Sequence, residues 1–361
     1  MQIITLSKRW KHHSVSAGYD RLLNNIDSVD ISPVRRKHYF IQKKYRKYFW
    51  NKIYQKSRLL NHYGLSDFIT EARVLLRSKL KSTDVVHALY AEDQLNLLLQ
   101  HREKLSSALV GSFHLPVESA YIQNVLPTGI FDRFRRLDAA IVVSNSMVDH
   151  YEKLIGAGKV FYVPHGIDTE IFCPAEIEKD KHSEKLEILI VGGHGRDWKL
   201  VEQTILQTKK YGLDISFRAV VPPGVSRRLK LLPNTETFSG IPEKELIDLY
   251  RKADAVFLPV NFATANNSLL EALACGTPVI STNIGGIPDY LNEDCGWLLP
   301  EGNSESIFEL LHSVSKNREL AKMKSVPART SALRFDWENI AEEIQAVYST
   351  AVQNYNSKHD R

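Results

Sequence analysis

A segment of small and polar residues, Asn261–Ile280, combines a loop and a helix in a way that suits phosphate binding. The sequence predicts that a strand ends at Pro259 and that a helix begins near Asn266 and stops at Gly276. The first backbone N–H groups of a helix have no partner within it, so they can receive an anion. Glu271, just over one turn into the helix, could accept hydrogen bonds from a pair of ribose hydroxyls. A capped helix with an incidental glutamate explains the same residues.

A glycine-rich turn, Gly192–Gly195, follows the predicted strand 187–191 and precedes two cations, Arg196 and Lys199. Glycine lets the backbone approach a phosphate closely, and a paired arginine and lysine can neutralise the charge that grows on a leaving diphosphate. This pattern makes Arg196 and Lys199 candidates for catalysis. A solvated turn with surface charges is the alternative interpretation.

Histidines near strand ends are weaker candidates, because a lone histidine is more often a structural residue. His114 follows the predicted strand 108–113, His87 lies in the predicted strand 84–89, and His13 lies in the loop after the first strand. In the same loop, Gly18 would allow close approach of the backbone to a ligand, and Tyr19 follows it. An ordinary strand-to-helix turn fits Gly18 equally well.

Short apolar runs that alternate with helical patterns must position these residues. A polar and charged stretch, 174–185, divides the runs into two series. Such a pattern predicts two doubly wound α/β domains with parallel sheets, whose ligands bind beyond the carboxyl ends of the strands and in the cleft between the domains. The predicted strands are 3–6, 84–89, 108–113, 139–143 and 161–164 in the first series, and 187–191, 215–220, 255–259 and 278–281 in the second.

The composition of the 361 residues excludes several protein classes. With 43% hydrophobic and 25% charged residues, the chain is neither disordered nor collagen-like. Its three cysteines, Cys173, Cys275 and Cys295, lack paired or metal-like spacing, which favours a reducing compartment such as the cytoplasm. The N-terminal residues do not resemble a signal peptide, and no apolar run is long enough to span a membrane.

The net charge of +5 is concentrated in one segment, because ten basic residues and no acidic ones lie between Arg35 and Arg58. Aromatic residues such as Tyr45 and Trp50 alternate with these cations. Three interpretations remain open: a helix at the surface of an anionic membrane, a helix packed on the sheet with a solvated basic rim, and a nucleic-acid surface. The first is favoured, and the third is disfavoured because no nucleic-acid-binding motif accompanies the segment.

These motifs resemble the retaining family-4 glycosyltransferases of the GT-B fold. The residues from Glu271 to Ile280 match the second half of that family's Glu-x7-Glu signature, whose second glutamate holds the nucleotide ribose. Ala263 occupies the place of the first glutamate, and the Thr-Ala-Asn-Asn sequence that follows it resembles a bacterial branch of the family. The segments 191–199, 163–168, 285–289 and 335–337 resemble further family motifs in the expected order.

The resemblance implies two Rossmann-like domains that face an interdomain cleft. Residues 1–172 would form the acceptor-side domain, completed by a crossing helix at 338–361, and 186–337 the donor-binding domain, with a linker at 173–185. The implied donor-binding residues are Gly18, Gly193, Arg196, Lys199, Thr264, Asn266, Asn267, Ser268 and Glu271, the implied catalytic residues are His114, Arg196 and Lys199, and second-rank residues on the acceptor side are His13, Tyr19 and His87.

The implied reaction is transfer of a hexosyl unit, with retention, from a UDP- or GDP-linked sugar to a hydroxyl of a lipid-linked, polysaccharide or glycolipid precursor at the cytoplasmic membrane face. The chain contains no Asp-x-Asp sequence, so neither a metal nor a cofactor beyond the donor is expected. Two alternatives stay open. One is a GT-B enzyme that isomerises or hydrolyses a nucleotide sugar, and the other is a catalytically silent binding scaffold, which Ala263 suggests.

Overall fold

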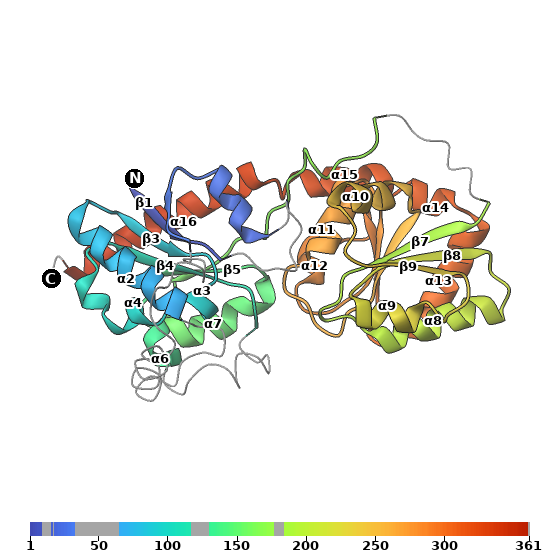
Figure 1. Cartoon of the computed structure of the whole chain (residues 1–361), viewed down its shortest axis with the longest axis horizontal. Helices are drawn as coiled ribbons and strands as arrows, with labels where there is room; N and C mark the ends of the chain where they lie inside the picture. Colours follow the sequence, from blue (N-terminus) through green and yellow to red (C-terminus); the bar gives the residue numbers. More distant parts are fainter. Residues whose placement is uncertain (9–15, 17, 33–64, 117–129, 177–183, 360–361) are drawn as a thin grey trace, which may run out of the picture. The chain divides into compact units, whose positions relative to one another are not determined.

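The computed structural model describes residues 1–8, 16, 18–32, 65–116, 130–176 and 184–359. The chain divides into two compact units. The first comprises Met1–His12, Tyr19–Pro164 and Ile340–Arg361, and the second comprises His13–Gly18 and His165–Asn339. Each unit contains one parallel sheet with helices on both faces (Figure 1). His13 and the basic segment 35–58 lie outside the described residues.

The sheet of the first unit has the strand order β2-β1-β3-β4-β5-β6, and all its strands are parallel. Four of these strands, β1, β3, β4 and β5, are buried at every position, which explains their nearly continuous apolar sequences. The elements are β1 Ile3–Leu6, β2 Val29–Asp30, α2 Leu65–Leu80, β3 Val85–Ala88, α3 Ala91–Gln94, α4 Leu97–Gln100, β4 Ala108–Phe113, α6 Ile130–Phe134, β5 Ala139–Val142, α7 Val148–Ile155, β6 Val160–Tyr162 and α16 Trp337–His359.

The sheet of the second unit has the order β12-β11-β10-β7-β8-β9 and is also parallel. Alternate residues of β7 supply two separate cores: Ile188 packs in the cluster that contains Ile205 of α8, and Leu189 packs in the cluster that contains Leu269 of α11. The elements are β7 Leu186–Val191, α8 Trp198–Lys210, β8 Ile215–Val220, α9 Pro223–Leu229, β9 Thr235–Phe238, α10 Glu243–Lys252, β10 Ala255–Leu258, α11 Asn267–Ala274, β11 Val279–Thr282, α12 Ile287–Tyr290, β12 Gly296–Leu299, α13 Ser304–Lys316, α14 Glu319–Lys322 and α15 Ser325–Leu333.

Two doubly wound parallel α/β units confirm the predicted fold class, and each predicted strand has its counterpart in the structure. Three further strands, β2, β9 and β12, were not predicted. All three lie at the edges of the sheets, and most of their side chains are partly or fully exposed. Because edge strands do not need to be apolar on both faces, β2 and β9 leave no continuous hydrophobic run in the sequence. The prediction missed β12 although Trp297, Leu298 and Leu299 are apolar, whereas the fourth edge strand, β6, was predicted.

The boundary between the units lies at 164/165, before the predicted one at 172. Phe172 is buried in the core of the second unit, and the backbone N–H of Ile167 donates to the carbonyl of Phe335 at 2.9 Å. These contacts fix residues 165–172 to the second unit. The last helix, α16, begins in that unit and returns to the first, where the side-chain amide of Asn354 donates to the carbonyl of Asp138 at 3.0 Å.

We expect Gly166→Ala to destabilise the second unit. A Cβ at this position would lie 2.4 Å from the ring of Trp337, which is buried where α16 begins. Overpacking of this kind lowers the free energy of unfolding by about 1–3 kcal/mol. Gly224→Ala in α9 is the matched control, because a Cβ there meets no described atom within 4 Å. Denaturant unfolding measures the effect, and equal midpoints for the two variants would contradict it.

Candidate functional site

The first residues of α11 carry backbone N–H groups that can donate to a ligand. Asn266 caps the helix, since its side chain accepts from the N–H of Leu269 at 3.3 Å. Across the part of the chain that the structure describes, no acceptor is recorded for the backbone N–H groups of Asn267 and Ser268. Gly276 ends the helix with a φ of 73°, a conformation that favours glycine. The predicted start and stop of this helix are therefore confirmed.

The position of Ala263 is fixed by a hydrogen bond between its backbone and a neighbouring glycine turn. Its carbonyl accepts from the N–H of Gly286 at 2.9 Å, and a Cβ on Gly285 would lie 2.3 Å from the same oxygen. The φ of Gly285 is 57°, so glycine is needed here both for conformation and for space. Thr264, the next residue, is buried. The Gly285–Gly286 turn thus fixes the loop at the position where the resembling family has its first glutamate.

Arg196 lies beneath the glycine turn, with only 8% of its surface exposed. Its guanidinium donates to the carbonyls of Val191 and His194, both at 3.0 Å, and to the hydroxyl of Ser268 at 3.3 Å. A Cβ on Gly192 would lie 2.6 Å from Nη2 of this arginine. The donors of Arg196 therefore connect β7, the turn and α11. Its predicted contact with a diphosphate stays a prediction.

Lys199 and Gly193 occupy different environments. Lys199 is exposed in the first turn of α8, which Asp197 caps by accepting from the N–H of Leu200 at 2.9 Å. Its ammonium group is therefore available for an anion. At Gly193 a Cβ would lie 2.6 Å from the ring of Pro222. Packing against this proline explains the glycine without any phosphate.

Glu271 forms the centre of a buried polar group. Its Oε2 accepts from the hydroxyl of Tyr250 at 2.8 Å, and both residues are buried. Burial raises the pKa of Glu271 to about 7, and Glu243 adds to this rise, whereas the Tyr250 hydrogen bond and Arg196 oppose it. The structure thus brings Glu271, Arg196 and Ser268 together. The prediction that they bind a nucleotide-sugar donor stays a prediction. Tyr250 was missed, because nothing in the sequence of α10 distinguishes it from a core residue.

His114 is fixed in the first unit by its ring contacts. Its Nε2 donates to the carbonyl of Leu89 at 2.8 Å, which places the proton of a neutral ring on that nitrogen. The ring lies 4.6 Å from the ring of Tyr90, measured between centroids, and 4.7 Å from that of Tyr19, which it meets edge-on. His114 is half-buried, so it keeps some access to solvent.

Tyr19 and His87 are fully buried. Their predicted role on the acceptor side stays a prediction. Nδ1 of His87 lies 2.7 Å from the hydroxyl of Tyr348, and Nε2 lies 2.8 Å from that of Ser112. Burial, helped by the nearby His114, lowers the pKa of His87 to about 3. Gly18, just before Tyr19, has a φ of 121°, so a glycine is required there whether or not a ligand approaches.

Glu92 is a buried carboxyl that the sequence reading did not single out. It is 2% exposed, and its Oε1 accepts from the backbone N–H of His114 at 2.8 Å. Within the described ranges, Oε2 has no hydrogen-bond partner. Burial raises the pKa of Glu92 to about 8 and Asp93 adds to the rise, while surrounding backbone N–H groups oppose it. Glutamate is rarely this buried unless it is paired, but the sequence does not reveal its burial.

The described residues contain neither a metal-binding cluster nor a membrane-spanning helix. No group of three or more His, Cys, Asp or Glu residues among them could hold a metal ion. None of their helices has the length and apolar composition needed to cross a membrane.

Comparison with known proteins relates both units to glycosyltransferases. Residues 225–329 match the family model described as glycosyl transferases group 1, and residues 10–171 match the model described as glycosyltransferase family 4. The chain is 26% identical over 248 residues to a D-inositol 3-phosphate glycosyltransferase of Rhodococcus jostii, an alignment that covers 68% of this chain and 51% of that protein. The chain spans about half or less of the length of the curated relatives it matches.

Solved structures of glycosyltransferases share the fold. The sucrose-phosphate synthase of Thermosynechococcus elongatus has a TM-score of 0.69 and 17% identity, with 97% of this chain and 98% of that chain covered. Anabaena HepE in complex with UDP-glucose has a TM-score of 0.67 and 15% identity, with 97% of this chain and 100% of that chain covered. The chain therefore has the GT-B fold, and each of its two units matches a glycosyltransferase family model.

We expect the stability of the first unit to depend on pH through Glu92. In the unfolded chain this carboxyl loses its proton near its ordinary pKa of 4.5, whereas the folded protein keeps the proton up to about pH 8. The folded state binds more protons within this window, so the free energy of unfolding falls as pH rises, by up to about 1.4 kcal/mol per pH unit.

Glu92→Gln removes this dependence, because an amide does not ionise. The difference in unfolding free energy between the variant and the wild type should move in favour of the variant from about pH 5 to about pH 8. Denaturant titration at the two pH values measures it, and His87 cancels because both proteins contain it. Parallel stability curves for the two proteins would contradict the prediction.

Proposed function

We propose that the protein is a retaining hexosyltransferase that moves a sugar from a nucleotide diphosphate donor to a hydroxyl acceptor. The observation that carries this proposal is the buried Glu271–Tyr250 pair behind the open N-terminus of α11, in a chain with the GT-B fold. This arrangement combines an acceptor for ribose hydroxyls with backbone donors for phosphate on a single short helix.

In this proposal, α11 binds the donor nucleotide. The backbone N–H groups of Asn267 and Ser268 donate hydrogen bonds to a phosphate oxygen, and the helix dipole favours the negative charge there. Oε2 of Glu271 is held by Tyr250, so Oε1 accepts from the ribose. UDP and GDP are the expected nucleotides, and HepE, which shares the fold, has been solved with UDP-glucose.

Lys199 stabilises the leaving diphosphate. It is exposed at the start of α8, and its ammonium group can neutralise the charge that develops as the glycosidic bond breaks. Arg196 is a positioning residue in this proposal, because its guanidinium donates both to the glycine turn before Lys199 and to Ser268 of α11. We assign no step of the reaction to a metal ion.

His114 is the candidate residue of the first unit against the donor sugar. Its hydrogen bond to Leu89 and its contacts with Tyr19 and Tyr90 fix the ring in one orientation. Retention follows in this proposal from attack on the same face that the diphosphate leaves, with an oxygen of the leaving phosphate accepting the acceptor's proton. The acceptor is proposed to be a lipid-linked, polysaccharide or glycolipid precursor at the cytoplasmic membrane face, with the basic segment 35–58 in contact with anionic lipid.

A catalytically silent nucleotide-sugar scaffold is the second candidate. Ala263 favours it, because this position lacks the carboxylate that family members direct at the donor sugar, while the surrounding loop is still rigidly held by Gly286. Tight donor binding without sugar transfer or donor hydrolysis, across a panel of candidate acceptors, would support this alternative over the transferase.

Lys199→Ala should lower kcat by about 10²-fold, because a cation is removed from the leaving group in the transition state. Lys209→Ala is the matched control: it removes an exposed lysine from the other end of the same helix. Release of UDP or GDP from labelled nucleotide sugars in the presence of acceptor measures the effect. Equal turnover in the two variants would refute the role of Lys199.

Donor affinity should rise with pH through Glu271. Its pKa of about 7 means that the carboxylate, the better acceptor for ribose hydroxyls, predominates above neutral pH. Thermal shift with UDP, GDP and ADP sugars should therefore be larger at about pH 8 than at about pH 6 for the wild type. Glu271→Gln keeps an acceptor for Tyr250 and should show a smaller shift with no such trend. A trend of equal size in the variant would exclude Glu271 as its source.

A further inference from the structure

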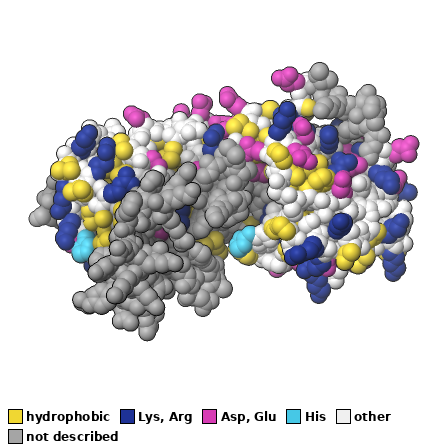
Figure 2. All heavy atoms as spheres, in the orientation of Figure 1, with side chains coloured by type: hydrophobic (Ala, Val, Ile, Leu, Met, Phe, Trp, Pro, Cys, Tyr) yellow, Lys and Arg dark blue, Asp and Glu magenta, His cyan; other side chains and the backbone are white. Residues whose placement is uncertain are grey.

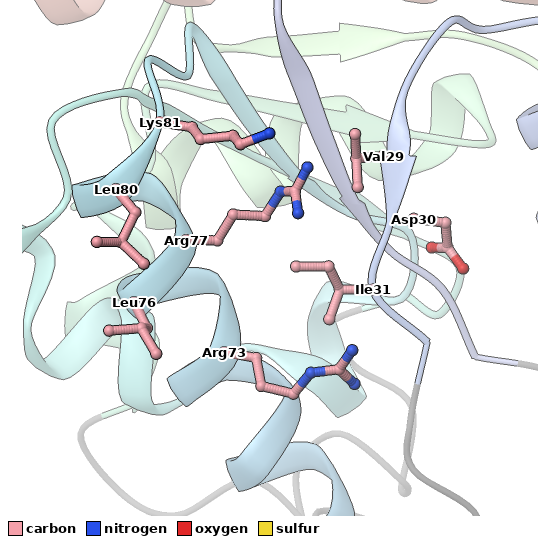
Figure 3. A pocket seen from close by; sticks show the side chains of 8 residues that line it. All are labelled: Val29, Asp30, Ile31, Arg73, Leu76, Arg77, Leu80 and Lys81. Carbon is pink, nitrogen blue, oxygen red and sulfur yellow. The ribbon is translucent and has the colours of Figure 1, made fainter.

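A groove lies in the first unit between α2 and the edge strand β2, away from the candidate site residues. It encloses about 380 Å³. Figure 3 shows Arg73, Arg77 and Lys81 extending from α2 toward the strand, with Leu76 and Leu80 to their left. Its lining residues are Val29, Asp30, Ile31, Arg73, Leu76, Arg77, Leu80 and Lys81.

The positive charge of the groove exceeds its negative charge among the described lining residues, which include three cations and one carboxylate, Asp30. Arg73 and Arg77 are spaced four residues apart, so their side chains lie along one face of α2. Lys81 directly follows the last residue of the helix, and its backbone N–H donates to the carbonyl of Arg77 at 2.9 Å. No ion pair joins any of them to an acidic residue in the described part of the chain. The one acidic lining residue, Asp30, accepts hydrogen bonds from the hydroxyls of Ser7 at 2.8 Å and Thr5 at 3.2 Å.

Aliphatic side chains beside these cations are unusually exposed. The exposed fractions are 74% for Leu80, 60% for Leu76 and 42% for Val29. Leu76 and Leu80 are also spaced four residues apart, so they form a second stripe adjacent to the first. Figure 2 shows the same combination at the end of the first unit where α2 lies: Lys and Arg side chains interspersed with hydrophobic ones.

We propose that this face of α2 and β2 docks on the surface of an anionic lipid membrane. Cations attract the phosphate headgroups, and the leucines enter the boundary between headgroups and acyl chains, where their apolar area leaves water. A nucleic acid fits less well, because the described lining residues include no aromatic side chain for base stacking, and phosphate contacts do not require exposed leucines.

The groove is formed by elements next to the basic segment 35–58, for which a membrane contact is also proposed. The two elements that line it, β2 and α2, are the described elements directly before and after that segment in the chain. The inference extends the proposed function, but it rests on Arg73, Arg77, Lys81 and the exposed aliphatic residues and does not depend on sugar transfer.

Vesicle co-sedimentation of the full chain tests the proposal, with phosphatidylcholine vesicles that contain or lack phosphatidylglycerol. The wild type should bind the anionic vesicles and release them as salt rises. The triple variant R73Q/R77Q/K81Q should bind about 10²-fold more weakly, since each of the three cations near an anionic surface contributes a factor of about 5. The double variant L76Q/L80Q should also bind more weakly and lose the binding that persists at high salt.

A variant with three exposed lysines of the second unit replaced, K209Q/K244Q/K252Q, is the charge-matched control and should bind like the wild type. Thermal shift with UDP-glucose should be unchanged in all variants, so failure of docking is distinguished from failure of the donor site or of folding. Wild-type binding that does not need phosphatidylglycerol, or full binding by the triple variant, would overturn the proposal. Loss of RNA binding by the triple variant, without vesicle binding by the wild type, would assign the groove to nucleic acid instead.

Discussion

The second unit depends on one buried cation. The guanidinium of Arg196 joins the end of β7, the glycine turn and the N-terminal residues of α11. Burial lowers its pKa to about 10, and Tyr250 and Glu271 oppose the fall, so the charge persists at neutral pH. If it were absent, the carbonyls of Val191 and His194 would lose their partner inside the protein, which is costly. Gly192 is a glycine because this guanidinium occupies the space of its Cβ.

In the first unit, buried polar side chains that hydrogen-bond to one another likewise fix the position of His114. His87 is neutral and buried between Ser112 of β4 and Tyr348 of α16, and Ser112 also donates to the hydroxyl of Tyr19. Tyr19 in turn supports the ring of His114. Tyr348 of α16, the helix that returns from the second unit, is therefore part of the buried polar network next to His114.

Charges in this protein differ in role according to their burial. Arg196, Glu92 and Glu271 are buried and contact backbone or side-chain partners, so they fix the local structure. Arg196 and Glu271 also act on one another's pKa, since each favours the charged form of the other. Lys199 and the cations of α2 are free of such partners in the described structure, which leaves them available to external anions. The same residue types thus serve two purposes, and only their surroundings distinguish them.

The sequence by itself determined the fold class, the interior strands and the limits of α11, because strands buried on both faces need apolar runs and helix ends need residues such as Asn266 and Gly276. Tertiary structure alone decided the polar edge strands β2 and β9 and the inward direction of Arg196 and His87. Their partners are far away in the chain, since Ser268 lies 72 residues from Arg196 and Tyr348 lies 261 residues from His87. A motif specifies residue types and spacing, but burial and distant partners determine whether a side chain meets ligand or protein.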